Sequence, residues 1–380
     1  MIIALETWAR DWADLYGPIF SYESDGDGKQ RVALFVLCMN HEITRDNPLW
    51  KYVGELLGLN LRVGKRNLVA GADWRHIAKR WCTDICSEAG MVVDGIPINK
   101  NLMVLWLSRL PNYDWSEMTI EALLHPKDPQ DVPRALRLLD AVSEIRKLEP
   151  KDYNPSERAE LRVIQIIGTM FFYFLEPFIN RDLSLETQVE YLGTFGLLLF
   201  VLYQRNETAF CSSQLFYDSQ TLVKNAVFTV AKTQELNGDL PVYFCSLGDN
   251  SIEVLFGRVR SMRAHNPNFN ITELCDTFKS AMVLDVTYDE YPHLERIARR
   301  LNAARIRHLD HIGPRSIRGD VRGRSCRLPV AWAAAYQNLD TILDQFDIVL
   351  PVPPREFLKR PGRRHHAPQG RQVPRDLQRS

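Results

Sequence analysis

Residues 249–261 read Asp249-Asn-Ser-Ile-Glu253-Val-Leu-Phe-Gly257-Arg-Val-Arg260-Ser261. Apolar residues recur in this stretch at the spacing of an amphipathic helix, which predicts a helix with one face toward a core. The residues assigned to that face are Ile252, Leu255, Phe256 and Val259. Glu253, Gly257 and Arg260 follow the opposite stripe, where a carboxylate can bind a divalent cation and an arginine can hold a phosphate. From spacing alone, an ordinary helix with a solvated polar face is the more common explanation.

The composition is that of a globular protein with room for two or three cores: 380 residues, of which 45% are hydrophobic and 25% charged. Because 47 basic residues balance 47 acidic ones, nucleic-acid binding would depend on local basic patches rather than on net charge. One such patch is segment 351–380, whose eight basic and two acidic residues give a net charge of +6. Its prolines and glycines predict a disordered basic tail, which could bind phosphate, act as a nuclear address or have neither role.

The cysteine pattern and the apolar stretches bear on the compartment. Seven cysteines show no disulfide framework, which indicates a reducing environment. The N-terminus becomes charged before any signal-peptide core has formed. Segments 163–175 and 191–204 are apolar but shorter than the roughly 18 residues that span a bilayer, so they predict buried core helices. We therefore expect an intracellular protein, nuclear or cytoplasmic, that does not enter a membrane.

The chain is organised as a mixed N-terminal part followed by a long helical block. A short strand over 19–24 ends at Asp25-Gly-Asp27-Gly, a helix over about 31–39 follows, and a second strand over 67–71 stops before Asp73. A helix over about 74–89 comes next, and the pattern from about 101 to 237 is almost entirely helical. Within that block, residues 217–225 place several polar side chains on a predicted helix without an evident role.

Three acidic residues share a context: Asp25 at one strand end, Asp73 just past another, and Glu253 on the late helix. This order resembles that of the RNase H-like nucleases and transposases. Their chemistry needs carboxylates that converge on two divalent cations about 3.5 to 4 Å apart, which activate a water or a 3′-hydroxyl and stabilise the leaving oxygen. Carboxylates suit this task because Mg²⁺ prefers hard oxygen ligands.

Three motifs resemble those of one branch, the P-element-type transposases. Residues 24–31, Ser-Asp-Gly-Asp-Gly-Lys-Gln-Arg, resemble the family's strand-ending Cys-Asp-Gly-Ala segment. Residues 73–80, Asp-Trp-Arg-His-Ile-Ala-Lys-Arg, are similar to its Asp-Pro-x-His-Leu-Leu-Lys motif. Residues 249–261 resemble Asp-x-Leu-Glu-x-Phe-Phe-Gly-x-Ile-Arg-Ser. Each motif is weak by itself, but the three occur in the family's order.

The resemblance implies roles for particular residues. Asp25 and Glu253 would be catalytic and, with Asp27, would bind Mg²⁺ or Mn²⁺. The supporting residues would be Asp73, His76 and Lys79, and the contacts to DNA phosphate would come from Arg80, Arg258 and Arg260. DNA would be the partner, and homo-oligomerisation stays open. GTP binding is implied by the resemblance only, because no phosphate-cradling glycine pattern is present.

We therefore expect a predominantly helical α/β protein with an incomplete RNase H-like core interrupted by a long all-helical insertion. The expected segments are 1–100 and 241–350 for the core, 101–240 for the insertion, and 351–380 for the tail. By the resemblance, the chain begins at the helix before the core's fourth strand. The first strands, the first aspartate and the family's zinc-bearing DNA-binding module would then be missing, as in a truncated copy or an incomplete gene model.

Three functional hypotheses remain. The first is a working metal-dependent DNA-processing enzyme. The second, which we favour, is a transposase-derived protein whose DNA cleavage and strand transfer are ancestral and which as this chain is inactive, binding DNA or protein through its helical block and tail. The third is an all-helical interaction scaffold without nuclease ancestry, which would be preferred if Asp25 and Glu253 lay far apart.

Overall fold

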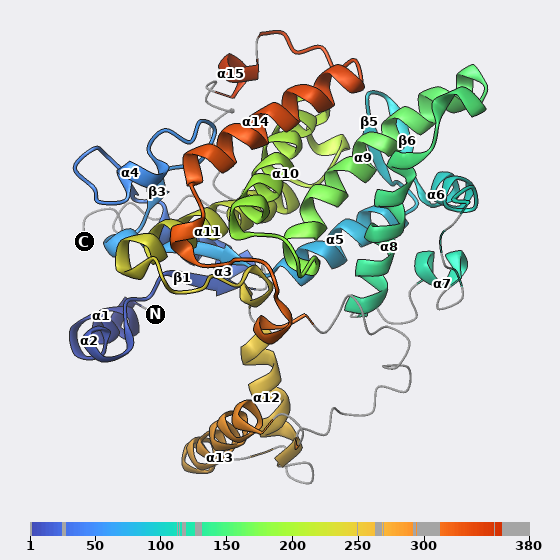
Figure 1. Cartoon of the computed structure of the whole chain (residues 1–380). Coiled ribbons are helices and arrows are strands. Elements are labelled where there is room, and N and C mark those ends of the chain that lie inside the picture. Colours follow the sequence, from blue (N-terminus) through green and yellow to red (C-terminus); the bar gives the residue numbers. More distant parts are fainter. Residues whose placement is uncertain are drawn as a thin grey trace.

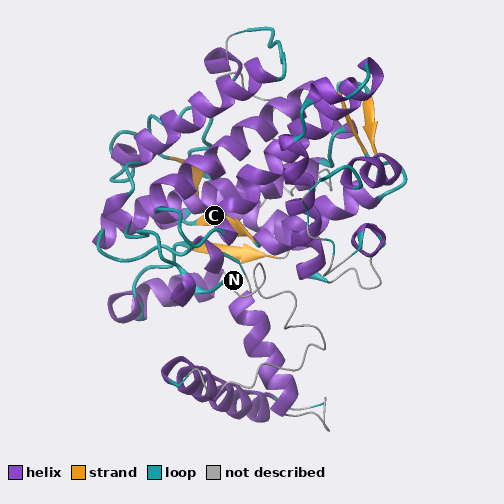
Figure 2. Ribbon diagram, turned by 45° about the vertical axis from the view of Figure 1, so that its right-hand side comes forward, coloured by secondary structure: helices purple, strands orange, loops and turns teal. Residues whose placement is uncertain are grey.

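The computed structural model describes residues 2–24, 28–111, 113, 115, 119–125, 131–248, 250–262, 268, 270–291, 294, 312–352 and 354–358. Within these ranges the protein is predominantly helical and its strands are short (Figure 2), which confirms the predicted predominance of helix. Asp25, Asp27 and most of the predicted basic tail lie outside the described residues.

The elements follow the chain in a mixed N-terminal part and then a series of longer helices. The N-terminal elements are α1 (Ile2–Asp11), α2 (Ala13–Tyr16), β1 (Ser21–Ser24), α3 (Gly28–Cys38), β2 (His41–Glu42), α4 (Trp50–Val53), β3 (Arg62–Val63), β4 (Val69–Ala72), α5 (Trp74–Cys86), β5 (Met91–Val93) and β6 (Ile96–Ile98). The later helices are α6 (Lys100–Leu107), α7 (Ile120–Leu124), α8 (Val132–Glu144), α9 (Pro155–Ile179), α10 (Leu185–Asn206), α11 (Ser213–Asn237), α12 (Asn250–Met262), α13 (Ile271–Glu290), α14 (Leu328–Gln345) and α15 (Pro354–Phe357).

Strands β1 and β4 form a parallel pair, whereas β2–β3 and β5–β6 are antiparallel. Side chains alternate between the two faces of a strand. Tyr22 and Ala70 face a small cluster that includes Leu34 and Cys38 of α3. Glu23 and Gly71 face α11, where Asn225 donates a hydrogen bond to Glu23. Two helices thus cover opposite faces of this short parallel pair.

Helices α9, α10 and α11 lie in the middle of the molecule, and α14 packs on α10 (Figure 1). Helix α9 begins at a capping box in which Asn154 and Glu157 each bond the other's backbone N–H, with Pro155 in the first turn. Its side chains at Phe171 and Phe174 are completely buried. Helices α9 and α10 are long and apolar enough to cross a membrane, but both are mostly buried within the fold, as the sequence predicts for core helices.

Two glycines allow the central helices to approach each other closely. A Cβ at Gly168 of α9 would lie 2.6 Å from the carbonyl oxygen of Val142 in α8, a distance at which the helices would have to move apart. A Cβ at Gly193 of α10 would lie 3.1 Å from Ala335 of α14. Because one hydrophobic core runs through the three predicted segments 1–100, 101–240 and 241–350, their boundaries as separate units stay a prediction.

The polar stretch 217–225 of α11 contains Asp218, which forms a buried ionic cluster with Arg31 and Arg80. The carboxylate of Asp218 accepts hydrogen bonds from Arg31 of α3 at 2.7 and 3.1 Å and pairs with Arg80 of α5. Both Asp218 and Arg31 are buried. A buried charge requires a partner of opposite charge, so this cluster fixes how α3, α5 and α11 sit together.

Helices α12 and α13 project from this body and pack against each other (Figure 1). Val259 and Ala281 are buried between them. The prediction that Ile252 and Phe256 face a core is wrong, because their exposed fractions are 56% and 46%. The helical spacing is present, but in the described part of the chain no third element covers this face of α12.

Candidate functional site

The carboxyl ends of β1 and β4 lie together at one edge of the parallel pair, because parallel strands end on the same side. Asp25 directly follows β1 but lies outside the described residues, as does Asp27. Asp73 directly follows β4 and is the N-cap of α5, where its side-chain oxygen accepts a hydrogen bond from the backbone N–H of His76 at 2.9 Å. The capping bond satisfies a helix-terminal donor, which explains why α5 begins here.

The imidazole of His76 lies between two carboxylates that come from distant parts of the chain. Its Nδ1 is 3.3 Å from Oδ1 of Asp73, and its Nε2 is 4.0 Å from Oε1 of Glu253. The side chain of Asp73 is 2% exposed and that of Glu253 is 60% exposed. The fold therefore brings the motif at 73–80 together with the motif at 249–261, and the imidazole connects a buried acid to a solvent-facing one.

The buried carboxylate of Asp73 is held in its charged form. Burial alone would raise its pKa, but interactions with His76, among them the hydrogen bond from its backbone N–H, and the positive charge of Arg75 outweigh that effect. The pKa of Asp73 therefore lies below its ordinary value.

Glu23 on β1 is the third acidic residue that the structure describes at the site. Burial, reinforced by the charge of Asp73, raises the pKa of Glu23 to about 7, although hydrogen bonds from Asn225 and from the backbone of Gly248 act in the opposite direction. The Asn225 amide lies 2.9 Å from Oε1 of Glu23. Sequence reasoning missed Glu23 because a four-residue strand does not reveal which of its faces is covered by a helix.

Two glycines leave room for these carboxylates. A Cβ at Gly71 would overlap the side chain of Glu23, and a Cβ at Gly248 would overlap the carboxylate of Asp73. Gly248 also adopts a φ of +136°, a conformation that residues with a Cβ rarely reach. Gly248 comes just before the motif of Glu253 in the sequence, and this position is the signal that could have linked it to the site.

The basic residues predicted to contact phosphate have different surroundings. The guanidinium of Arg80 is paired with Asp218, and that of Arg258 is paired with Asp285 on α13. The side chain of Arg260 is exposed. Lys79 lies on α5 one turn after His76. A phosphate contact by any of these residues stays a prediction.

Metal and nucleotide binding also remain predictions. Among the residues whose placement is described, no group of three or more His, Cys, Asp or Glu side chains is arranged to hold a metal ion. Two of the three predicted ligands, Asp25 and Asp27, lie outside those residues, and Glu253 is the predicted ligand that can be placed.

The site thus combines the exposed carboxylate of Glu253, an imidazole, the buried acid Asp73 and the half-buried acid Glu23 at the end of a parallel strand pair. The surroundings of the two acids shift their pKa values in opposite directions. Burial raises the pKa of Glu23 to about 7, whereas interactions with His76 and Arg75 lower the pKa of Asp73. No protein-family model matches the chain, and no curated protein or solved structure is significantly similar to it.

Proposed function

We propose that this chain is derived from a P-element-type transposase with an RNase H-like core, and that metal-dependent DNA cleavage and strand transfer are its ancestral activity. The observation that carries the proposal is the approach of His76 to Glu253, with Nε2 and Oε1 4.0 Å apart. The second and third motifs of the resemblance meet there, beside the strand end that leads into the first motif at Asp25.

We propose further that the chain by itself binds a divalent cation and DNA without cutting the DNA. Two-cation catalysis needs several ionised carboxylates whose oxygens reach the cations. Of the acids at the described site, Asp73 is buried and caps α5, and burial raises the pKa of Glu23 to about 7. Glu253 is then the described acid whose carboxylate is open to solvent.

The test is a titration of the purified chain with Mg²⁺ and Mn²⁺ by calorimetry, together with binding and nicking assays on labelled DNA. We expect Glu253→Gln and Asp25→Asn each to weaken cation binding by about ten-fold, because each removes one charged ligand. The matched control is Glu290→Gln, which neutralises an exposed glutamate at the end of α13 and should leave cation binding unchanged.

Each outcome decides between the hypotheses. Cation binding that depends on Glu253 and Asp25, without nicking, supports the proposal. Nicking that is lost in both variants would overturn the proposed inactivity and make the chain a working nuclease. Absence of cation binding, or equal binding by wild type and both variants, would overturn the metal site and with it the functional reading of the motifs.

A second candidate function is a non-catalytic protein-binding helical module. The observation that favours it is the exposed apolar surface of α12 and α13, where Ile252, Met282, Val283 and Val286 are each more than half exposed. Exposed apolar side chains that lie together mark interaction surfaces more often than isolated ones do. Under this alternative, substitutions at Glu253 would leave all binding properties unchanged.

A further inference from the structure

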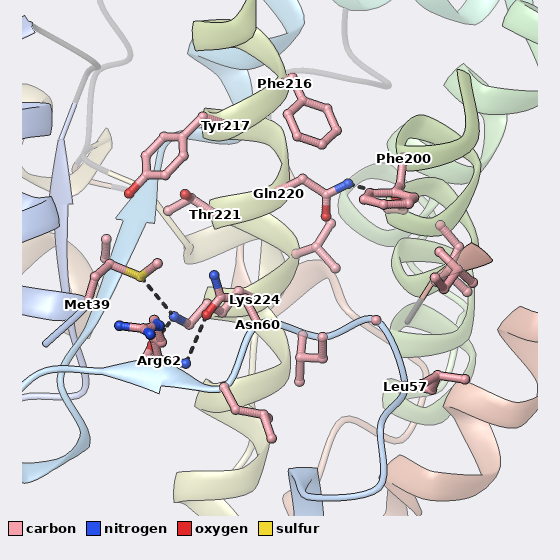
Figure 3. A pocket seen from close by; sticks show the side chains of 18 of the residues that line it. Met39, Leu57, Asn60, Arg62, Phe200, Phe216, Tyr217, Gln220, Thr221 and Lys224 are labelled. Carbon is pink, nitrogen blue, oxygen red and sulfur yellow. Dashed lines mark hydrogen bonds between the residues drawn. The ribbon is translucent and has the colours of Figure 1, made fainter. Parts of the chain in front are cut away.

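A pocket of about 710 Å³ lies between the β2–β3 region and helices α3, α10 and α11 (Figure 3). Its volume is in the range of pockets that bind small organic molecules, roughly 300 to 1,000 Å³. Most of its wall is apolar. The side chains at one end include Phe200 and Phe216, and those at the other include Lys224, Asn60 and Arg62.

The amine of Lys224 is the feature of this pocket that needs a chemical explanation. Lys224 is 6% exposed, and buried ammonium groups are normally paired with an acid. Its Nζ instead donates to the carbonyl oxygen of Arg62 and contacts Sδ of Met39 at 3.5 Å. In the described part of the chain, no carboxylate lies within ion-pair distance of this amine.

Two polar side chains of the pocket, Asn60 and Gln220, are held in place by hydrogen bonds to the backbone. The side-chain oxygen of Asn60 accepts a hydrogen bond from the backbone N–H of Arg62 at 2.8 Å, and the amide of Gln220 donates to the carbonyl oxygen of Gly196 at 2.8 Å. These bonds fix the two side chains and engage one polar atom of each. Arg62 adds a second positive charge to the polar end, and Glu42 is the acidic residue among the lining side chains.

We propose that this pocket binds a small amphipathic carboxylate, whose head group pairs with Lys224 and whose apolar or aromatic body packs against Phe200 and Phe216. A ligand carboxylate would supply the negative partner that the buried amine lacks. A charge-assisted hydrogen bond is about twice as strong as a neutral one. The apolar wall favours a ligand with one compact anionic group over a polyanion, which would have to be desolvated along its whole length. This inference is independent of the proposed function at Glu253.

The state of the free pocket fits this ligand. Burial lowers the pKa of Lys224 to about 7, with a further lowering from Arg62 and an opposing effect of Cys38 on α3. Lys232 on the same helix is a second buried amine, and Glu42 and Tyr217 line the pocket from β2 and α11. A bound carboxylate favours the charged amine, so binding takes up a proton.

The first experiment compares two ligands on the wild-type protein by calorimetry. The probes are 4-phenylbutyrate and 4-phenylbutanol, which share the same aromatic body and differ in the charge of the head group. At pH 7, we expect 4-phenylbutyrate to bind about ten-fold more tightly than 4-phenylbutanol. At pH 9, we expect the affinity for 4-phenylbutyrate to be lower than at pH 7 by a factor of about ten or more, because the amine loses its proton. Equal affinity for the two probes, pH-independent binding or absence of binding would each overturn the proposal.

The second experiment uses a matched pair of lysine variants. Lys224→Met removes the charge from the pocket and should abolish the preference for 4-phenylbutyrate over 4-phenylbutanol. Lys232→Met removes the second buried amine of α11, which donates to the carbonyl oxygen of Phe20 outside the pocket, and should leave the preference intact. Loss of the preference in both variants, or in neither, would contradict the assignment of Lys224. If Lys224→Met does not fold, the comparison of ligands on wild type still decides the proposal.

Discussion

Helix α9 and the helices α12 and α13 all carry apolar residues at helical spacing. They differ in how many neighbouring elements surround them. Helix α9 is enclosed by α8, α10 and neighbouring segments, and Phe171 and Phe174 are completely buried. Helices α12 and α13 pack on each other and leave Phe256 46% exposed. An amphipathic pattern therefore predicts a helix and an apolar stripe, but the number of neighbouring elements determines how much of that stripe is buried.

The largest effect should come from removing an aromatic ring from each region. Phe171→Ala leaves a cavity in a closed core, so we expect it to destabilise the protein by about 3 to 5 kcal/mol. Phe256→Ala removes a ring that is half exposed and contacts Phe278 edge-on at 5.7 Å, so we expect a loss below about 1 kcal/mol. Urea denaturation of both variants measures the difference. Equal losses would show that the face of Phe256 is covered in solution.

A second comparison places a methyl group on a glycine of each region. Gly168→Ala would put its Cβ 2.6 Å from the carbonyl oxygen of Val142, which should destabilise the protein by about 1 to 3 kcal/mol. Nothing lies within 4 Å of a Cβ at Gly257, so Gly257→Ala should stabilise α12 by about 0.5 to 1 kcal/mol through helix propensity. Thermal and urea unfolding provide the measurement. Stabilisation by Gly168→Ala would contradict the close approach of α8 and α9.

We expect the free energy of unfolding to depend on pH through Glu23 on β1 rather than through residues of α12 or α13. The pKa of Glu23 is about 7 in the folded protein and about 4.5 when the chain is unfolded. Between pH 4.5 and about 7, Glu23 is therefore more often protonated in the folded than in the unfolded state. Its contribution to stability is fully present below pH 4.5 and is lost as pH rises to about 7. Glu23→Gln should remove this decrease, which we expect to be about 2 kcal/mol.

The control for this measurement is Glu290→Gln, which neutralises an exposed residue of α13 and should leave the pH profile unchanged. Urea denaturation at pH 5 and pH 7 gives the profile. A profile of Glu23→Gln that runs parallel to that of the wild type would contradict the raised pKa of Glu23.

The smallest effect should come from polar substitution on the exposed face of α13. Val283 is 65% exposed, so Val283→Ser should change the free energy of unfolding by less than about 0.5 kcal/mol. A loss well above this value, measured in the same denaturation assay, would mean that another copy of the chain or another segment covers this face in solution.

Much of the helical framework could be predicted from local signals. The apolar segments 163–175 and 191–204 predicted core helices and lie within α9 and α10. The predicted helix over about 74–89 is α5, which begins at Trp74. The N-cap role of Asp73 was not predicted, although a capping side chain acts over only three residues. The acidic turn after β1 was also predicted, but it lies outside the described residues.

The candidate site was predictable only in part. The motif at 73–80 and that at 249–261 were both singled out, and the fold brings them together at His76 and Glu253. Glu23 and Gly248 were missed because their roles depend on contacts with Asn225 and Asp73, which come from other parts of the chain. Sequence spacing carries no information about such distant neighbours.

The polar residues of α11 show the same division. Their positions on a helix could be predicted from the sequence. That Asp218 pairs with Arg31 and Arg80, and that Lys224 lines a pocket, is seen only in the folded structure. The sequence by itself determined which segments are helical, where several of them begin and which carry apolar stripes, because these properties depend on residues within one or two turns. Only the tertiary structure decided which stripes are buried and which charges are paired, because burial and pairing require neighbours that the chain brings together only when it folds.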